Sequence, residues 1–150
     1  MELTEFLVDA KKYTYSYGGS RKYKRLNDGS YEFFFRKENF EFRDRYFGFD
    51  NFAGEEVVFL AGEPVWVLNY RGSFLGGENS SIEVVYQFLR KALLATTAKA
   101  PFRGGKYFNE AEYTYMNHVE GGVDRFRGTE FILFEKERVY ELFYHGGKVS

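Results

Sequence analysis

The sequence predicts an α+β fold in which two helices pack on an antiparallel sheet. Three observations support this: two segments with apolar residues at helical spacing, aromatic-rich runs separated by turn signals, and an internal repeat. Residues 50–72 and 124–146 align without a gap, and nine of the 23 aligned positions are identical. The repeat predicts a single domain, 1–150, built from two pseudo-twofold-related halves at about 1–75 and 80–150.

The first half begins with a predicted helix from Leu3 to about Tyr17, which places one apolar stripe opposite Lys and Glu residues. Two consecutive glycines stop this helix. The pair Asp28-Gly29 then marks a tight hairpin turn. The strands predicted in this half span residues 21–26, 30–36, 40–47, 55–60 and 64–71.

The second half repeats this plan after a link over residues 72–80 that is rich in glycine and serine. Ser80 and Glu83 form an S-x-x-E capping box, which predicts a helix over residues 81–96. Residues 98–109 are predicted to be loop. The strands are predicted near residues 112–119, 129–135 and 138–145. Each half is therefore expected to be one helix followed by three strands, and the first half has an added hairpin.

The two copies of the repeat also predict the centre of the core. Alternation along the strands places one set of residues on equivalent faces, which we expect to be buried. This set is Trp66, Leu68, Tyr70, Tyr140, Leu142 and Tyr144.

The composition is globular, with 44% hydrophobic and 29% charged residues, and excludes several functions. A net charge of −1 disfavours nucleic acid as a partner, so the basic residues 21–25 fit a solvated edge strand better. The absence of cysteine excludes disulfides and thiolate chemistry. No signal peptide or apolar run of transmembrane length is visible, so we expect a cytoplasmic protein without a membrane partner. Abundant Glu, Lys and Arg are typical of thermophiles.

Asp44 is the leading candidate site residue. It aligns with Asn117, and both fall on strand faces that carry aromatic residues. A carboxylate in that position must be paired or hydrogen-bonded, or its pKa rises. Two interpretations stay open: a ligand-binding or acid–base site at the sheet centre, or a buried aspartate that ties strands to a helix end. The candidate partners of Asp44 are Arg45, Tyr46, Tyr70 and Tyr144.

Other polar residues extend the candidate set. Arg43 and Arg45 lie about 7 Å apart at alternate strand positions. They would clamp a phosphate or carboxylate, or pair with glutamates on an outer face. A zinc site would need His118, His145 and a carboxylate, but the spacing does not demand one, and we predict no metal or cofactor. The full set of ligand-binding candidates is Arg43, Asp44, Arg45, Tyr46, Asn69, Tyr70, Asn117, Tyr144 and His145.

Four runs carry a resemblance to a known family: RDRYFGFDNFAGEEVVF, PVWVLNYRG, APFRG and VYELFYHGGKV. They resemble a family of small uncharacterised archaeal and bacterial proteins, and the likeness extends from the first helix to the end. In some bacteria a similar domain follows an XRE-type helix-turn-helix module. The resemblance implies no established activity. It implies a sensor module, here in a stand-alone form, that binds a small molecule or a partner.

Three hypotheses for function follow. The first is a domain that binds a small ligand, with anions among the candidate ligands, in an aromatic-lined pocket. The second is a hydrolase or isomerase in which Asp44 or Glu56 is the general base and His145 the acid. The third is a protein-interaction module anchored by exposed phenylalanines at positions 47, 49 and 52. The sequence leaves the ligand, the reaction and the oligomeric state open, including a homo-oligomer.

Overall fold

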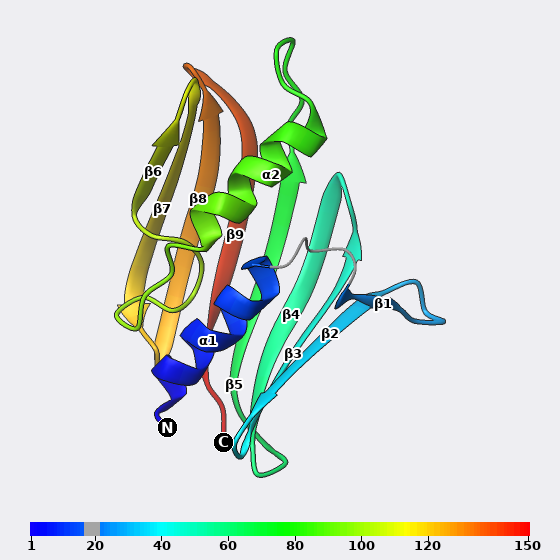
Figure 1. Ribbon diagram of the computed structural model, residues 1–150, viewed down its shortest axis with the longest axis vertical. Helices are drawn as coiled ribbons and strands as arrows, with labels where there is room; N and C mark the ends of the chain where they lie inside the picture. The colour runs from blue at the N-terminus through cyan, green and yellow to red at the C-terminus, as the bar shows by residue number, and fades with distance from the viewer. Residues whose placement is uncertain (17–21) are drawn as a thin grey trace.

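The computed structural model describes residues 1–16 and 22–150, and it confirms the α+β class (Figure 1). Two helices lie on one face of an antiparallel sheet that has nine strands within these residues, in the order β1-β2-β3-β4-β5-β9-β8-β7-β6. The helices are α1 (Leu3–Ser16) and α2 (Ile82–Leu93). The strands are β1 (Lys24–Arg25), β2 (Tyr31–Lys37), β3 (Phe40–Gly48), β4 (Asn51–Leu60), β5 (Glu63–Phe74), β6 (Tyr107–Glu110), β7 (Tyr113–Gly122), β8 (Arg125–Phe134) and β9 (Glu137–Lys148).

Helix α1 follows the predicted apolar stripe. Phe6, Leu7 and Ala10 are fully buried against the sheet, and the Phe6 ring stacks on the Phe40 ring with centroids 4.9 Å apart. The predicted end at Tyr17 lies outside the described residues.

Helix α2 begins one residue later than the capping box predicted. The N-cap is Ser81, whose Oγ accepts a hydrogen bond from the Val84 amide at 3.4 Å. Ser80 instead hydrogen-bonds the Tyr113 hydroxyl at 3.1 Å. The helix ends at Leu93 rather than residue 96, because the Thr96 amide donates to the Leu93 carbonyl in a tighter turn.

Several strands are longer than predicted, and one was missed. Strand β4 begins at Asn51 rather than residue 55, because its first residues pair with the end of β5. Strand β6 begins within the segment 98–109 that was predicted to be loop, and it pairs with β7 across a turn at Ala111, where φ is +53°. Within the described residues each half is therefore a helix with a four-strand meander, and β1 is an additional short edge strand.

The sheet is symmetrical in order about its two central strands. Strands β5 and β9 pair with Tyr70 opposite Tyr144. Strands β4, β3 and β2 follow on one side, and β8, β7 and β6 follow on the other. This order agrees with the sequence repeat, while duplication as its origin stays a prediction.

The core lies between the helices and one face of the sheet. The six residues predicted there are all buried, with exposed fractions between 0% and 8%. The opposite face of the sheet carries exposed side chains such as Phe34 and Phe143. Side chains of neighbouring residues in a strand point to opposite faces of the sheet. Candidate residues can therefore share a site only if they lie on the same face.

Candidate ligand-binding cavity

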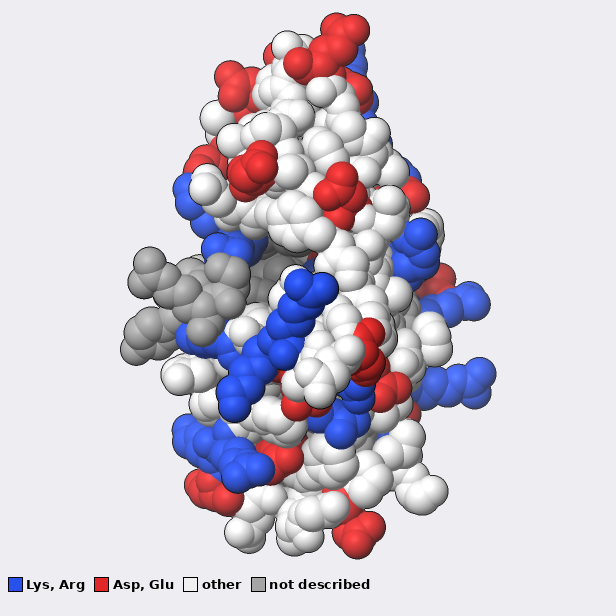
Figure 2. Space-filling model, turned by 90° about the vertical axis from the view of Figure 1, so that its right-hand side faces the viewer, with Lys and Arg blue, Asp and Glu red and all other residues white. Residues whose placement is uncertain are grey.

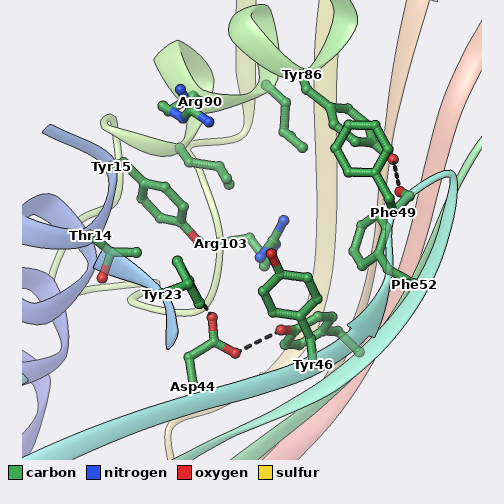
Figure 3. Close-up of a pocket in the computed structure, with 14 residues that line it drawn as sticks. Thr14, Tyr15, Tyr23, Asp44, Tyr46, Phe49, Phe52, Tyr86, Arg90 and Arg103 are labelled. Atoms are coloured by element: carbon green, nitrogen blue, oxygen red, sulfur yellow. Dashed lines mark hydrogen bonds between the residues drawn. The ribbon is translucent and has the colours of Figure 1, made fainter. Parts of the chain in front are cut away.

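A cavity of about 220 Å³ lies on the helix-covered side of the sheet, between the two helices and strands β3 to β5 (Figure 3). Polar side chains at its wall include Asp44 from β3, Arg90 from α2 and Arg103 from the segment after α2. The aromatic residues that line it are Tyr15, Tyr23, Tyr46, Phe49, Phe52, Tyr70 and Tyr86. The cavity therefore combines an apolar, aromatic wall with a small number of charged groups, as ligand sites do.

Glycines in the repeat position the central tyrosine. Tyr70 lies opposite Gly54 on the neighbouring strand, and a Cβ atom on Gly54 would be only 2.5 Å from the Tyr70 hydroxyl oxygen. The missing side chain lets Tyr70 lie across β4 and reach β3. The other half has the same arrangement, because a Cβ atom on Gly128 would be 2.1 Å from the Tyr144 ring. This close approach explains why both residues recur in the repeat.

Tyr70 and Tyr23 hold the Asp44 carboxylate from two sides. The Tyr70 hydroxyl donates to Oδ1 at 2.6 Å, and the Tyr23 hydroxyl donates to Oδ2 at 2.7 Å (Figure 3). Asp44 is only 7% exposed. Burial, followed by the nearby charge of Glu56, raises the pKa of Asp44 to about 6, although the two tyrosine hydrogen bonds oppose the shift.

Two further buried carboxylates have cationic partners. Lys11 pairs with Glu56 at 2.7 Å and also donates to the Phe102 carbonyl. Arg103 pairs with Glu130 at 2.6 Å. Burial lowers the pKa of Lys11, which the Glu56 charge opposes. The two pairs leave Asp44 as the one buried carboxylate without an ion pair among the described residues.

Two hydroxyl groups at the cavity have no hydrogen-bond partner among the described residues. These belong to Tyr15 and Tyr46, and both point toward the cavity in Figure 3. Burial raises the pKa of both tyrosines above its ordinary value. They therefore stay protonated at neutral pH and can donate hydrogen bonds.

The structure divides the predicted candidates between the two faces of the sheet. Asp44, Tyr46 and Tyr70 line the cavity. Asn117 and Tyr144 lie on the same face in the other half, where the Tyr144 hydroxyl donates to Asn117 at 2.8 Å. The candidates that project from the opposite, outer face are Arg43, Arg45, Asn69 and His145.

The two arginines do not form an anion clamp at the cavity. Arg45 pairs with Asp28 and donates to Ser30 Oγ at 3.0 Å, rather than to the glutamates predicted as partners. The Arg43 guanidinium lies over the Phe59 ring, 5.3 Å from its centroid. Both arginines are thus used on the outer face, because odd-numbered residues of β3 point away from the helices.

Two other predicted groupings are also separated. Asp44 faces the helices while His145 is exposed on the outer face, so the acid–base pair of the enzyme hypothesis is not formed. Phe47 and Phe49 are 50% and 56% exposed, and Phe49 and Phe52 line the cavity and pack against Tyr86. Phe47 projects from the opposite face of the sheet to Phe52. The three phenylalanines therefore do not form one anchor patch.

Sequence reasoning missed the cavity residues contributed from outside the central strands. Tyr15 comes from the last turn of α1, and Tyr86 and Arg90 are one helical turn apart on α2. Tyr23 lies in the basic segment 21–25, which was predicted to be a solvated edge strand. Arg103 lies in the segment 98–109, which was predicted to be loop. The i, i+4 spacing of Tyr86 and Arg90 was the available signal, since it places an aromatic ring and a charge on one helix face.

The described residues show neither a metal site nor a membrane span. No three of their His, Cys, Asp or Glu side chains are grouped so that they could hold a metal ion. No helix in this part of the chain is long and apolar enough to cross a membrane. On the face seen in Figure 2, Lys and Arg side chains are interspersed with Asp and Glu.

Most of the chain matches one protein family, whose function is unknown. Residues 44–149 match the family described as a domain of unknown function, DUF5680. The chain therefore belongs to this family. The match begins at Asp44 in β3 and runs through β9, so it excludes α1, which the resemblance had included. No curated protein and no solved structure matches the chain.

Proposed function

We propose that the protein binds a small molecule in the cavity between the helices and strands β3 to β5, as a sensor-type module. The observation that carries this proposal is the Asp44 carboxylate, which is buried at the cavity wall without an ion pair among the described residues. An unpaired buried charge is costly for a fold, so its position beside open space favours a role in binding.

The cavity offers a complementary set of polar groups to such a ligand. Asp44 accepts hydrogen bonds, and the hydroxyls of Tyr15 and Tyr46 donate or accept them. Arg90 adds a half-buried positive charge from α2. A few polar groups that converge within an aromatic wall can fix the orientation of a ligand and give specificity.

The chemistry of these groups supports binding rather than turnover. The raised pKa values of Tyr15 and Tyr46 make both phenols poor proton donors near neutral pH. His145, the acid of the enzyme hypothesis, lies on the other face of the sheet. Asp44 therefore has no partner of matched pKa at the cavity wall among the described residues.

The position of the cavity supports a sensor role. Its wall includes Thr14 and Tyr15 at the end of α1, and Tyr86 and Arg90 on α2. A ligand that contacts both helices and Asp44 on β3 would fix the helices against the sheet. In a protein that joins such a domain to a DNA-binding module, this change in helix packing would be the signal.

A groove on the outer face is larger, about 640 Å³, and brings Asn69 and His145 together. Its one carboxylate already has a cationic partner, because Arg127 pairs with Glu120 at 2.8 Å. Arg127 and Glu120 are 78% and 56% exposed, so water already solvates them. The cavity is the better candidate, since Asp44 has no ion pair within residues 1–16 and 22–150 and is only 7% exposed to water.

The test is a ligand-observed NMR screen with a fragment library, using wild-type protein and two variants. Leu89→Trp fills the cavity, and Thr129→Trp adds the same bulk in the outer groove as a matched control. We expect hits that are lost in Leu89→Trp and kept in Thr129→Trp. Backbone amide shifts in the wild type provide a second readout. The proposal fails if no fragment changes the amide chemical shifts of cavity residues such as Tyr46 and Tyr86. It also fails if every fragment that binds the wild type still binds Leu89→Trp.

A further inference from the structure

The buried charges on the helix-covered side of the sheet do not balance. The described residues bury three carboxylates there, Asp44, Glu56 and Glu130, but only two cations, Lys11 and Arg103. The cations are committed to Glu56 and Glu130 in ion pairs of 2.7 Å and 2.6 Å. Among the described residues one buried carboxylate, Asp44 at the cavity wall, therefore has no counter-ion.

The hydrogen bonds to Asp44 do not supply the missing charge. Both donors, Tyr23 and Tyr70, are neutral phenols, and burial raises the pKa of each well above its ordinary value. Each carboxylate oxygen accepts one of these bonds and keeps further acceptor capacity. Asp44 is thus held in place while it can still contact a ligand in the cavity.

The aromatic wall favours the same kind of ligand. The faces of Tyr and Phe rings carry negative potential and attract cations, including ammonium groups in aromatic cages. Tyr46, Phe52 and Tyr86 line the cavity together with Asp44. At about 30 Å³ for each water in the liquid, the cavity of about 220 Å³ suits a molecule of several heavy atoms rather than a bare ion.

We propose that this cavity binds a small organic ammonium ion, with its nitrogen against Asp44 and its carbon atoms against the aromatic rings. The proposal rests on the proposed function and names the ligand class for that site. Arg90 is the cation at the wall that has no ion pair among the described residues. Arg90 is half-buried, whereas Asp44 is buried. Water therefore screens the repulsion between Arg90 and an ammonium ligand more than it screens the attraction between Asp44 and that ligand.

The experiment is isothermal titration of the full 150-residue chain at pH 7.5, where Asp44 is ionised. Choline and ethanolamine are the ammonium probes, and 3,3-dimethyl-1-butanol is the uncharged isostere of choline. We expect at least one ammonium probe to bind at least about tenfold more tightly than the isostere, which matches the size of desolvated cation–π and charge contributions. Binding of ethanolamine alone would indicate a ligand that donates N–H bonds, and binding of choline would indicate a methylated one.

Two variants test the residue assignment with opposite expected signs. Asp44→Asn should weaken the ammonium probe at least about tenfold and remove its advantage over the isostere. Asn117 in the other half shows that this fold accepts asparagine at the equivalent position. Arg90→Gln should raise the affinity for the ammonium probe, because it removes a like charge from the cavity wall. If Asp44→Asn fails to fold, the comparison of choline with its isostere on the wild type still decides.

The inference is overturned if neither ammonium probe binds, if the isostere binds as well as choline, or if Asp44→Asn keeps full affinity. This failure is separable from failure of the proposed function. Uncharged fragments that bind wild type and are lost in Leu89→Trp would keep the cavity as a ligand site while rejecting the ammonium class.

Discussion

Tyr70 and Tyr144 face each other across the central strands, yet they serve two different environments. Each passes over a glycine of the neighbouring strand and donates to a side chain on the strand beyond. Tyr70 meets the Asp44 carboxylate at a cavity wall. Tyr144 meets the amide of Asn117, whose Nδ2 donates to the Gly104 carbonyl at 3.3 Å.

The difference arises from what covers each half. Phe102 is 1% exposed and stacks on Phe126 with centroids 4.1 Å apart, so the segment after α2 fills the second half. Phe52, the counterpart of Phe126 in the repeat, lines the cavity instead. A shared apolar and glycine frame thus preserves the fold in both halves, and the polar residues that differ set the site.

The largest expected difference between the halves concerns their buried glutamates. Glu130 accepts hydrogen bonds from Arg103, Tyr115 and Tyr140, so Glu130→Ala leaves a buried arginine unpaired. We expect a loss of about 3–5 kcal/mol in the free energy of unfolding. Glu56→Ala should cost less, because Lys11 can lose its proton when buried and arginine cannot.

Urea unfolding of both variants at pH 7 measures this contrast. A second series at higher pH sharpens it, since deprotonation of Lys11 should reduce the loss in Glu56→Ala only. Equal losses at every pH would show that the two ion pairs are equivalent, and would contradict the distinction between lysine and arginine.

The next effect is the pH dependence that Asp44 gives to the first half. Its pKa is about 6 in the fold, against an ordinary value of 3.8, so the native state binds the proton more tightly than the unfolded state. The free energy of unfolding should therefore rise as pH falls from about 7 to 4, by up to about 3 kcal/mol from this residue. Asp44→Asn should remove that contribution, as the difference between urea titrations of the two proteins will show. Parallel pH profiles would contradict the assignment.

The glycine positions separate the halves more finely. Gly54→Ala and Gly128→Ala should each cost about 1–3 kcal/mol, because a Cβ atom would overlap its neighbours. Near Gly128 the three closest atoms all belong to the Tyr144 side chain, whereas near Gly54 they include the Arg45 carbonyl oxygen at 2.6 Å. Tyr144→Leu should therefore relieve Gly128→Ala, and Tyr70→Leu should not relieve Gly54→Ala. Double-mutant cycles measure both couplings, and equal couplings would reject this reading of the contacts.

The frame of the molecule was predictable because its signals are local or repeated. Asp44 was predicted on a strand face that carries aromatic residues, and the repeat identified Tyr70 and Tyr144 as core; all three are buried. Strand β6 escaped prediction because its four residues are mostly exposed and carry no alternating apolar pattern. The boundaries of β4 depend on pairing with β5, which no local pattern records.

The site was predictable only in part, because it is assembled across elements. Asp44 and Arg45 are neighbours on β3, so their side chains project from different faces of the sheet. The list of candidate residues included both and therefore mixed two surfaces. Tyr15 and Tyr86 looked like ordinary helix-face aromatics, and only the way the two helices lie on the sheet turns them toward Asp44. Tertiary packing, rather than residue type, makes them cavity residues.

The smallest expected effect comes from Arg45, and it tests the division between the faces directly. Arg45 and Asp28 are 40% and 42% exposed, so Arg45→Ala should change stability by at most about 1 kcal/mol. Because Arg45 projects from the outer face, its removal should also leave the affinity of choline or ethanolamine unchanged, while Asp44→Asn one position away abolishes the preference for ammonium. The same titrations measure both variants. A tenfold loss in Arg45→Ala would contradict the division between the faces, because Arg45 projects from the outer face and donates its hydrogen bond to Ser30 there.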